Sequence, residues 1–257
     1  MATGVLPIAL STSTRFIDLL PTHNKAYEAV ARLGITTDTL DITGKQLSSS
    51  PVNVSLQQLE EVCESYKGEI LQTPPMYSAI SKDGKRLYEL ARNGIEIERE
   101  KRKITIYSLE ISDFDGASFK ISAECSAGTY IRSLCDDIGR ELGCGATLTE
   151  LKRTKANGFD IKDCHTLGEI EEAFNRGKIN DYLIPIENCF NCFDKITVSP
   201  AQARRFSNGG ELSKDRLKDN FTPAVYRVFS NENKFLGLGE IKENSDTLTV
   251  KKVFVNG

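Results

Sequence analysis

The alternation of apolar and polar residues in the first half of the chain predicts strands joined by polar segments. Residues 24–33, 104–111 and 118–125 alternate with the period of two that is typical of strands, and the first of these ends at Gly34. Residues 36–44 are polar and rich in turn-forming side chains, which predicts a loop.

Other segments repeat their apolar residues at helical spacing. Ser55 is followed three residues later by Gln58, the sequence of a capping box, so we expect a short helix to begin there. Three further segments show the same kind of pattern, and two of them stop at a glycine. They are residues 85–93 before Gly94, residues 130–142 before Gly143, and residues 167–174.

The pattern changes near residues 188–196, after which short apolar runs alternate with Gly, Asn and Asp. Residues 235–241 and 247–255 are expected to form a closing pair of strands. We therefore expect two domains, residues 1–190 and a small β-rich module over residues 196–257. Neither an internal repeat nor a low-complexity tract is found.

The composition is that of a soluble globular protein, with 39% hydrophobic and 27% charged residues among 257. No apolar run approaches the ~20 residues needed to span a membrane, and the first residues do not resemble a signal peptide. Seven cysteines, an odd number, are more consistent with reduced thiols than with a disulfide framework. We therefore expect a cytoplasmic protein that does not contact membranes.

The sequence contains no recognisable set of metal ligands. Cys189 and Cys192 form the only close cysteine pair, and a zinc site would need two more ligands. His23 and His165, the only histidines, are not spaced as ligands. We therefore expect no metal cofactor. The net charge of −3 argues weakly against a nucleic-acid partner, because the distribution of charge matters more than its sum.

Residues 125–139 carry the strongest chemical signal within the chain. A strand leads through a turn of small residues into a helix, with Tyr130 and Arg132 close to the helix start. The amino end of a helix offers free amides to anions, and the arginine fork binds carboxylates in a bidentate manner. On composition alone, a plain strand–turn–helix with a solvated arginine is the more common interpretation.

Six sequence strings together resemble the TruB family of bacterial tRNA pseudouridine synthases. Two of them are Ala-Thr-Gly-Val-Leu-Pro at residues 2–7 and Gly-Thr-Tyr-Ile-Arg at residues 128–132. The resemblance spans roughly the first 160 residues and is very specific, because the strings occur in the family's order. The other four are Lys25-Ala26-Tyr27 before Ala31-Arg32-Leu33-Gly34, Thr37–Asp41 before Gly44, Pro75–Ala79 before Lys82, and Gly143–Ala146 before Leu151-Lys152-Arg153-Thr154.

The resemblance implies an α+β fold. Its core is the mixed antiparallel sheet of the pseudouridine synthases with flanking helices, and a small β-rich, PUA-like RNA-binding domain follows. In the family, an extruded uridine enters a pocket beside a catalytic aspartate. The resemblance assigns base stacking to Tyr27, the pairing with the aspartate to Arg132, and the pocket wall to Leu151. It also places Tyr130 beside them and suggests that Asp41 helps to hold Arg132.

Taken without the family, these residues have simpler interpretations. Tyr27 would be a strand residue whose ring packs in the core, and Leu151 would be ordinary core filler. Asp41, together with Asp38, would form an Asx-turn that holds its own loop. The residues alone favour these simpler interpretations.

Binding RNA requires a local excess of positive charge. Residues 82–103 include Lys85 and Arg86 among several other basic residues, but they also contain five acidic ones, so a solvated mixed-charge face is an alternative. In the family, an insertion over about residues 74–103 closes on the T arm. We expect Lys85 and Arg86, and a second basic cluster that includes Lys152 and Arg153, to contact tRNA phosphates.

The resemblance finally implies the activity, which is isomerisation of the T-arm uridine at position 55 of tRNA, without metal or organic cofactor. We expect tRNA as the partner, a monomer, and no protein partner. The family's catalytic aspartate precedes the Ala-Thr-Gly string and would thus lie before Met1. We therefore expect the chain as given to be inactive, through a gene start assigned too late or a truncated copy. The alternative is a non-catalytic tRNA-binding or tRNA-folding protein.

Overall fold

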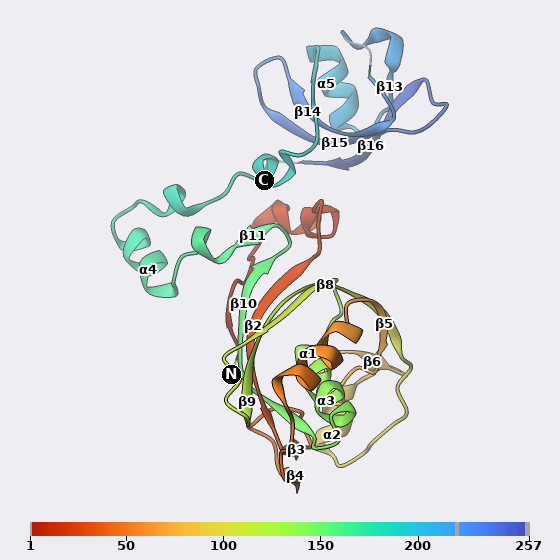
Figure 1. Ribbon diagram of the computed structural model, residues 1–257. Helices are drawn as coiled ribbons and strands as arrows, with labels where there is room; N and C mark the ends of the chain where they lie inside the picture. The colour runs from red at the N-terminus through yellow and green to blue at the C-terminus, as the bar shows by residue number, and fades with distance from the viewer. Residues whose placement is uncertain (1, 219–220, 255–257) are drawn as a thin grey trace. The chain divides into compact units, whose positions relative to one another are not determined.

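The computed structural model describes residues 2–218 and 221–254 of the chain (Figure 1). The chain forms two compact units. The first consists of Met1–Leu6 and His23–Cys164, and the second of Pro7–Thr22 and His165–Gly257. Each unit has its own sheet and its own hydrophobic core.

The first unit is built on a seven-stranded sheet of order β1-β10-β2-β9-β8-β5, with β11 paired to β10. The β1–β10 pair is parallel and the other pairs are antiparallel, so the sheet is mixed. The strands are β1 Thr3–Gly4, β2 Lys25–Leu33, β5 Gly68–Gln72, β8 Arg102–Ser112, β9 Ser118–Cys125, β10 Ala146–Ala156 and β11 Phe159–Asp160.

Two helices, α1 (Leu56–Ser65) and α3 (Ile131–Glu141), pack their apolar residues against this sheet (Figure 1). The predicted capping box begins α1, because the Ser55 hydroxyl accepts from the Gln58 amide at 3.2 Å and the Gln58 side chain accepts from the Ser55 amide at 2.9 Å. The buried contributions of the two helices are Leu59 and Cys63 from α1, and Ile131, Leu134, Cys135 and Ile138 from α3.

Helix α3 lies unusually close to the start of β10. A Cβ atom added to Gly139 would come within 2.1 Å of the Ala146 backbone nitrogen. Glycine at position 139 therefore permits this approach, which holds the carboxyl-terminal turn of α3 against the start of β10.

Smaller elements surround this core. A hairpin of β6 (Ser81–Lys82) and β7 (Lys85–Arg86) leads into the short helix α2 (Leu87–Arg92). A second hairpin pairs β3 (Ile35–Thr37) with β4 (Gln46–Ser49).

The second unit contains a five-stranded sheet of order β12-β14-β15-β16-β13 and the helix α5 (Pro200–Ser207). It also includes α4 (Leu167–Asn175) and a 3₁₀ helix over Ser11–Leu19. Phe16 of that 3₁₀ helix is fully buried against Phe190, Phe235 and Phe254. The strands of this unit are β12 Lys195–Val198, β13 Leu212–Ser213, β14 Ala224–Ser230, β15 Phe235–Ile241 and β16 Thr247–Val253. It also has short 3₁₀ helices over Ile179–Tyr182, Ile186–Phe190 and Lys214–Arg216, and the first unit has one over Ile161–Asp163.

The elements expected from the sequence are found, with changes at some ends. The strands over residues 118–125 and 235–241 have the predicted bounds. The helix expected over residues 85–93 begins only at Leu87, because the two residues before it pair in the β6–β7 hairpin. The loop expected over residues 36–44 includes the end of β3. The last predicted strand ends at Val253, and its residue 255 lies outside the described residues.

Several elements were not anticipated, among them the strands β5, β10, β12 and β14 and the helix α5. The end of β10 reads Lys-Arg-Thr-Lys, which lacks the apolar alternation of an ordinary strand. The domain limits at residues 190 and 196 stay a prediction. Over residues 2–218 and 221–254, no helix is both long enough and apolar enough to cross a bilayer.

Candidate active site

The candidate site begins where β2 and β10 pair. In their antiparallel register Tyr27 lies opposite Arg153, and Ala29 lies opposite Leu151. Residues two positions apart share a face of a strand. Tyr27 and Leu151 are therefore diagonal neighbours on one face of the sheet, and both pack partly buried against the main core.

The turn between β9 and α3 forms the facing wall. Cys125, the last residue of β9, lies opposite Lys25, the first residue of β2. Ser126 then bonds twice to Thr105 of β8, since its amide donates to the Thr105 carbonyl at 2.9 Å and its hydroxyl accepts from the Thr105 amide at 2.9 Å. This anchoring brings the exposed Gly128 and the start of α3 next to Tyr27.

Gln72, the last residue of β5, forms hydrogen bonds with the end of this turn. Its carboxamide accepts from the Tyr130 amide at 2.8 Å and donates to the Tyr130 carbonyl at 3.1 Å, and the residue is only 2% exposed. Tyr130 is the N-cap residue of α3. A buried amide that satisfies both backbone groups of one residue locks the backbone there. Sequence reasoning missed Gln72 because its partner lies 58 positions away.

Replacing Gln72 by leucine should destabilise the protein by about 1–3 kcal/mol, because the Tyr130 amide would lose its acceptor, while the Tyr130 carbonyl would keep only the bond from the Leu134 amide. Gln72→Glu keeps the acceptor for the Tyr130 amide and should cost less. Denaturant unfolding of the two variants checks this. Equal free energies of unfolding of Gln72→Leu and the unsubstituted protein would show that the hydrogen bonds between Gln72 and Tyr130 do not contribute to stability.

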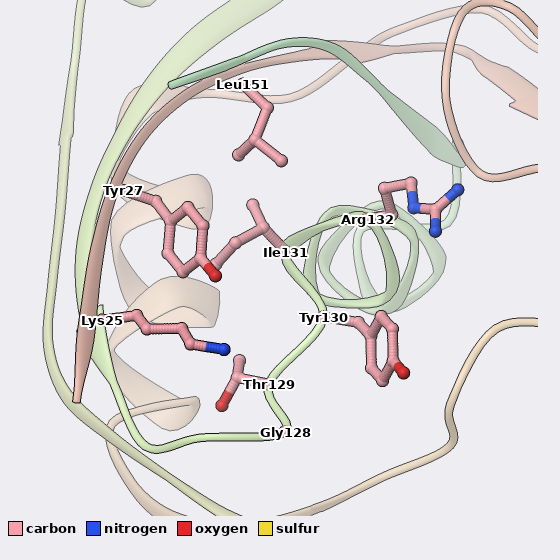
Figure 2. A pocket seen from close by; sticks show the side chains of 8 residues that line it. All are labelled: Lys25, Tyr27, Gly128, Thr129, Tyr130, Ile131, Arg132 and Leu151. Carbon is pink, nitrogen blue, oxygen red and sulfur yellow. The ribbon is translucent and has the colours of Figure 1, made fainter. Parts of the chain in front are cut away.

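These elements enclose a pocket of about 260 Å³ (Figure 2). This is slightly below the ~300–1,000 Å³ typical of small-molecule sites, so it suits one planar group such as a nucleobase. None of its lining residues carries a carboxylate. The lining consists of Lys25, Tyr27, Gly128, Thr129, Tyr130, Ile131, Arg132 and Leu151.

The structure therefore brings together four of the residues singled out from the sequence, Tyr27, Tyr130, Arg132 and Leu151. Sequence reasoning did not assign Lys25 a role, although it opens the Lys-Ala-Tyr string. The catalytic and binding roles of these residues stay predictions.

Arg132 is held from two sides. Its Nη1 lies 3.2 Å from Asp41 Oδ2 and 3.4 Å from the Thr39 carbonyl, and its Nη2 donates to the Tyr77 carbonyl at 2.8 Å. The side chains of Arg132 and Asp41 are 24% and 23% exposed. The Arg132–Asp41 contact suggested by the resemblance is thus present.

Asp41 also organises its own loop, as the simpler interpretation expected. Its Oδ1 accepts from the Thr43 amide at 3.0 Å, from the Thr39 hydroxyl at 3.1 Å and from the Thr43 hydroxyl. Burial by itself would raise the pKa of Asp41, but the bonds from Thr43, Thr39 and Arg132 outweigh burial and lower it. Asp41 is therefore a charged, fully engaged acceptor.

The lowered pKa of Asp41 makes a prediction about acid stability. A carboxyl whose pKa is lower in the folded state stabilises that state above its ordinary pKa of 3.8, and the contribution is lost as the pH falls further through the folded-state pKa. Asp41→Asn should therefore lower the free energy of unfolding most at neutral pH and progressively less below about pH 4. Denaturant unfolding at pH 7 and pH 3 measures this. A deficit of the same size at both pH values would contradict it.

Tyr27 keeps its phenol protonated at neutral pH. Burial and the neighbouring Cys125 raise its pKa, and the positive charge of Arg153 opposes this only in part. Arg153 itself donates from Nε to the Val5 carbonyl at 2.7 Å, and Val5 donates its amide to the Arg153 carbonyl at 2.8 Å. Arg153 therefore anchors the segment that follows β1 to β10.

The other basic residues expected from the sequence to contact tRNA, apart from Arg153, lie elsewhere in the first unit. Lys152 is exposed, with its register partners Glu28 on β2 and Thr3 on β1. Lys85 and Arg86 are exposed on β7, where Arg86 donates to the Ala79 carbonyl. None of the three lines the pocket. Their contact with RNA phosphates stays a prediction.

No set of three or more His, Cys, Asp or Glu side chains converges as a metal site anywhere in the described ranges. Cys63 and Cys135, in the core of the first unit, are equally unsuited to act as ligands or nucleophiles. Burial raises the pKa of Cys63 to about 12 and raises that of Cys135 further.

The architecture defines a class of protein. The chain is similar over 99% of its length to a chain of the structure titled "Crystal Structure of a Cbf5-Nop10-Gar1 Complex", with a TM-score of 0.71, 22% identity and 73% of that chain covered. A second similar structure, titled "Structure of H/ACA RNP bound to a substrate RNA containing 2'-deoxyuridine", has a TM-score of 0.70 and 21% identity, with 99% and 73% coverage. The fold is that of the pseudouridine synthases, as the resemblance implied.

The family is shown by sequence. The profile of the "TruB family pseudouridylate synthase (N terminal domain)" matches residues 1–131, that of the "tRNA pseudouridylate synthase B C-terminal domain" matches residues 132–191, and that of "Pseudouridine synthase II TruB, C-terminal" matches residues 195–253. This chain belongs to the TruB family, as its motifs predicted, and the family consists of isomerases that form pseudouridine.

Two relatives show how far the similarity extends. The tRNA pseudouridine synthase B of Clostridium novyi is 44% identical over 256 residues, which cover 99% of this chain and 86% of the relative. The protein of the same name from Azoarcus is 44% identical over 245 residues, which cover 95% and 80%. The similarity thus includes both units.

Proposed function

We propose that this protein takes part in converting the T-arm uridine at position 55 of tRNA to pseudouridine. The observation that carries the proposal is that an aromatic, a basic and an aliphatic residue, Tyr27, Arg132 and Leu151, together line one pocket of nucleobase size. The names of the relatives, tRNA pseudouridine synthase B, support tRNA as the substrate.

The pocket suits an extruded uracil. Taking a base out of its stack costs a few kcal/mol, and stacking on an aromatic ring returns ~1–3 kcal/mol. We assign the stacking surface to Tyr27, which stays neutral, and the opposing wall to Leu151. Tyr130, held by Gln72, borders the same space.

The chemistry requires a carboxylate that attacks the nucleoside. The N1–C1′ bond breaks and the detached base turns. A C5–C1′ bond then forms, the bond to the carboxylate is broken so that the carboxylate is regenerated, C5 loses its proton and N1 takes one up. We propose that Arg132 orients this carboxylate. Its guanidinium has five N–H donors, and the bonds to Asp41, Thr39 and Tyr77 leave some of them available.

The register of β1 supports this placement. β1 runs parallel to β10, with Thr3 opposite Lys152. A segment joined before Thr3 would therefore approach from the Leu151 side of the pocket. The family's Asp-x-x-Ala-Thr-Gly string would then bring its aspartate toward Arg132.

For the polypeptide of residues 1–257 we expect tRNA binding without isomerisation. The pocket lining contains no carboxylate, and Asp41 is occupied by Arg132 and its own loop. This observation also favours the second candidate, a non-catalytic tRNA-binding or tRNA-folding protein. In either case we propose a cytoplasmic monomer that needs no metal, organic cofactor or protein partner.

The test compares three polypeptides. The first is residues 1–257, and the second, the extended chain, is the same chain preceded by the amino-terminal segment of the Clostridium novyi relative. The third is the extended chain with the catalytic aspartate of that segment changed to asparagine. Each is assayed for tRNA affinity and for pseudouridine at each position of an unmodified tRNA transcript. Only the extended chain should isomerise the tRNA, at position 55 alone, and all three should bind it.

Three outcomes would contradict parts of this proposal. Turnover by residues 1–257 equal to that of the extended chain would refute the expected inactivity. Binding without turnover by the extended chain would favour the tRNA-folding alternative. Modification elsewhere than position 55 would refute the T-arm assignment.

A further inference from the structure

Lys25 lines the pocket but has no role in the chemistry described above. It is the first residue of β2 and precedes Tyr27 by two positions, so the two side chains leave the strand on the same face. Figure 2 shows the Lys25 ammonium directed across the pocket toward Thr129, on the side away from Leu151.

The charge of Lys25 is not neutralised within the described part of the chain. None of the ion pairs there involves Lys25. Its cross-strand neighbours are Ala156 and Cys125, and burial raises the pKa of the Cys125 thiol, which stays neutral. By contrast, Arg132, the other cation of the lining, is paired with Asp41.

Lys25 is partly exposed, and its ammonium, which has no counter-ion among the described residues, is available to a ligand that supplies one. The uracil base is neutral and offers only carbonyl oxygens to a cation. The sugar–phosphate backbone of an extruded nucleotide must remain at the mouth of the pocket, and the exposed Gly128 marks an open side of the pocket next to Lys25. A phosphate there would complete a charge-assisted bond.

We propose that Lys25 binds a phosphodiester group of the RNA backbone that flanks the uridine held in the pocket. This inference rests on the proposed function and identifies which part of the RNA this wall of the pocket contacts. It also explains how a chain with a net charge of −3 presents a positive charge where the nucleotide enters.

The first test measures tRNA affinity of residues 1–257 as a function of salt. Lys25→Met should weaken binding about 5- to 10-fold and reduce the slope of log Kd against log salt by about 0.7–0.9, the value for one phosphate contact. Lys25→Arg should keep the slope. Lys120→Met is the matched control, because Lys120 lies on β9, is paired with Asp113 at 3.4 Å and does not line the pocket.

The second test changes the RNA. A T-arm stem–loop with a neutral methylphosphonate at either linkage beside the target uridine should bind the unsubstituted protein about 5- to 10-fold more weakly at one of the two linkages. That linkage should make no further difference to Lys25→Met, since the same contact is already lost.

If the losses of affinity caused by Lys25→Met and by the methylphosphonate were additive, the proposal would be overturned. An unchanged affinity and an unchanged salt slope in Lys25→Met would also overturn it. A loss of turnover in the extended chain at unchanged affinity would also overturn it, because the cation would then act on the base. Failure of the unsubstituted protein to bind tRNA would refute the proposed function itself, and the phosphate site with it.

Discussion

Replacing Arg132 by alanine is expected to lower turnover of the extended chain by at least about 10²–10³-fold while tRNA affinity stays nearly unchanged. Removal of a preorganised charged or hydrogen-bonding group that acts on the reacting atoms typically has an effect of this size. Arg132 is preorganised, because Asp41 and the Tyr77 carbonyl hold its guanidinium at 3.2 and 2.8 Å. Single-turnover assays and equilibrium binding on the same tRNA separate the two quantities.

The substitution should also destabilise the fold, which provides an internal check. Arg132→Ala leaves Asp41 Oδ2 and the Tyr77 carbonyl without their donor, and because the pair is about one quarter exposed we expect a loss of about 1–2 kcal/mol. Arg140→Ala is the matched control, since Arg140 is on the same helix, pairs with Asp136 and is 73% exposed. A drop in turnover of the same size in Arg140→Ala would show that both variants act through stability.

Replacing Tyr27 by alanine should instead weaken tRNA binding, by about 5- to 150-fold. This range corresponds to the ~1–3 kcal/mol that stacking of a base on an aromatic ring contributes. The effect is measurable with residues 1–257, because capture of the base does not require the catalytic aspartate. Equilibrium binding of an unmodified tRNA transcript is the measurement.

Two controls bracket the Tyr27 experiment. Tyr27→Phe keeps the ring and should bind nearly as well as the unsubstituted protein. Tyr107→Ala removes a tyrosine of β8 that is 53% exposed and does not line the pocket, and should have little effect. If Tyr27→Ala and Arg132→Ala lost affinity equally while turnover in the extended chain stayed unchanged, both role assignments would be wrong.

Much of the candidate site was predictable because its parts lie at the ends of locally encoded elements. The strand over Lys25–Leu33 and the helix over Ile131–Glu141 follow from periodicity and from glycines beside their ends. The motifs place Tyr27 on this strand and Arg132 on this helix, and the family that the motifs resemble assigns a role to each of the two residues.

The contacts that support the site were not predictable in the same way. Gln72 looks like any polar residue at the end of a strand, yet it is 2% exposed and satisfies both backbone groups of Tyr130. Asp41 had two competing interpretations, and the structure shows both, since one carboxylate oxygen holds the loop and the other pairs with Arg132.

The sequence by itself determined the helices α1 to α4, the strands β2, β8, β9, β15 and β16, the family, and the residue types that the pocket requires. The tertiary structure decided how they meet. Strand β10, which does not alternate clearly, pairs with β2 across more than a hundred positions and thereby places Leu151 diagonal to Tyr27 and Arg153 beside it. Hydrophobic periodicity reports only which face of an element is buried. Strand partners and register depend on packing between distant segments, so the neutralisation of Arg132 and the unpaired charge of Lys25 become visible only in the folded chain.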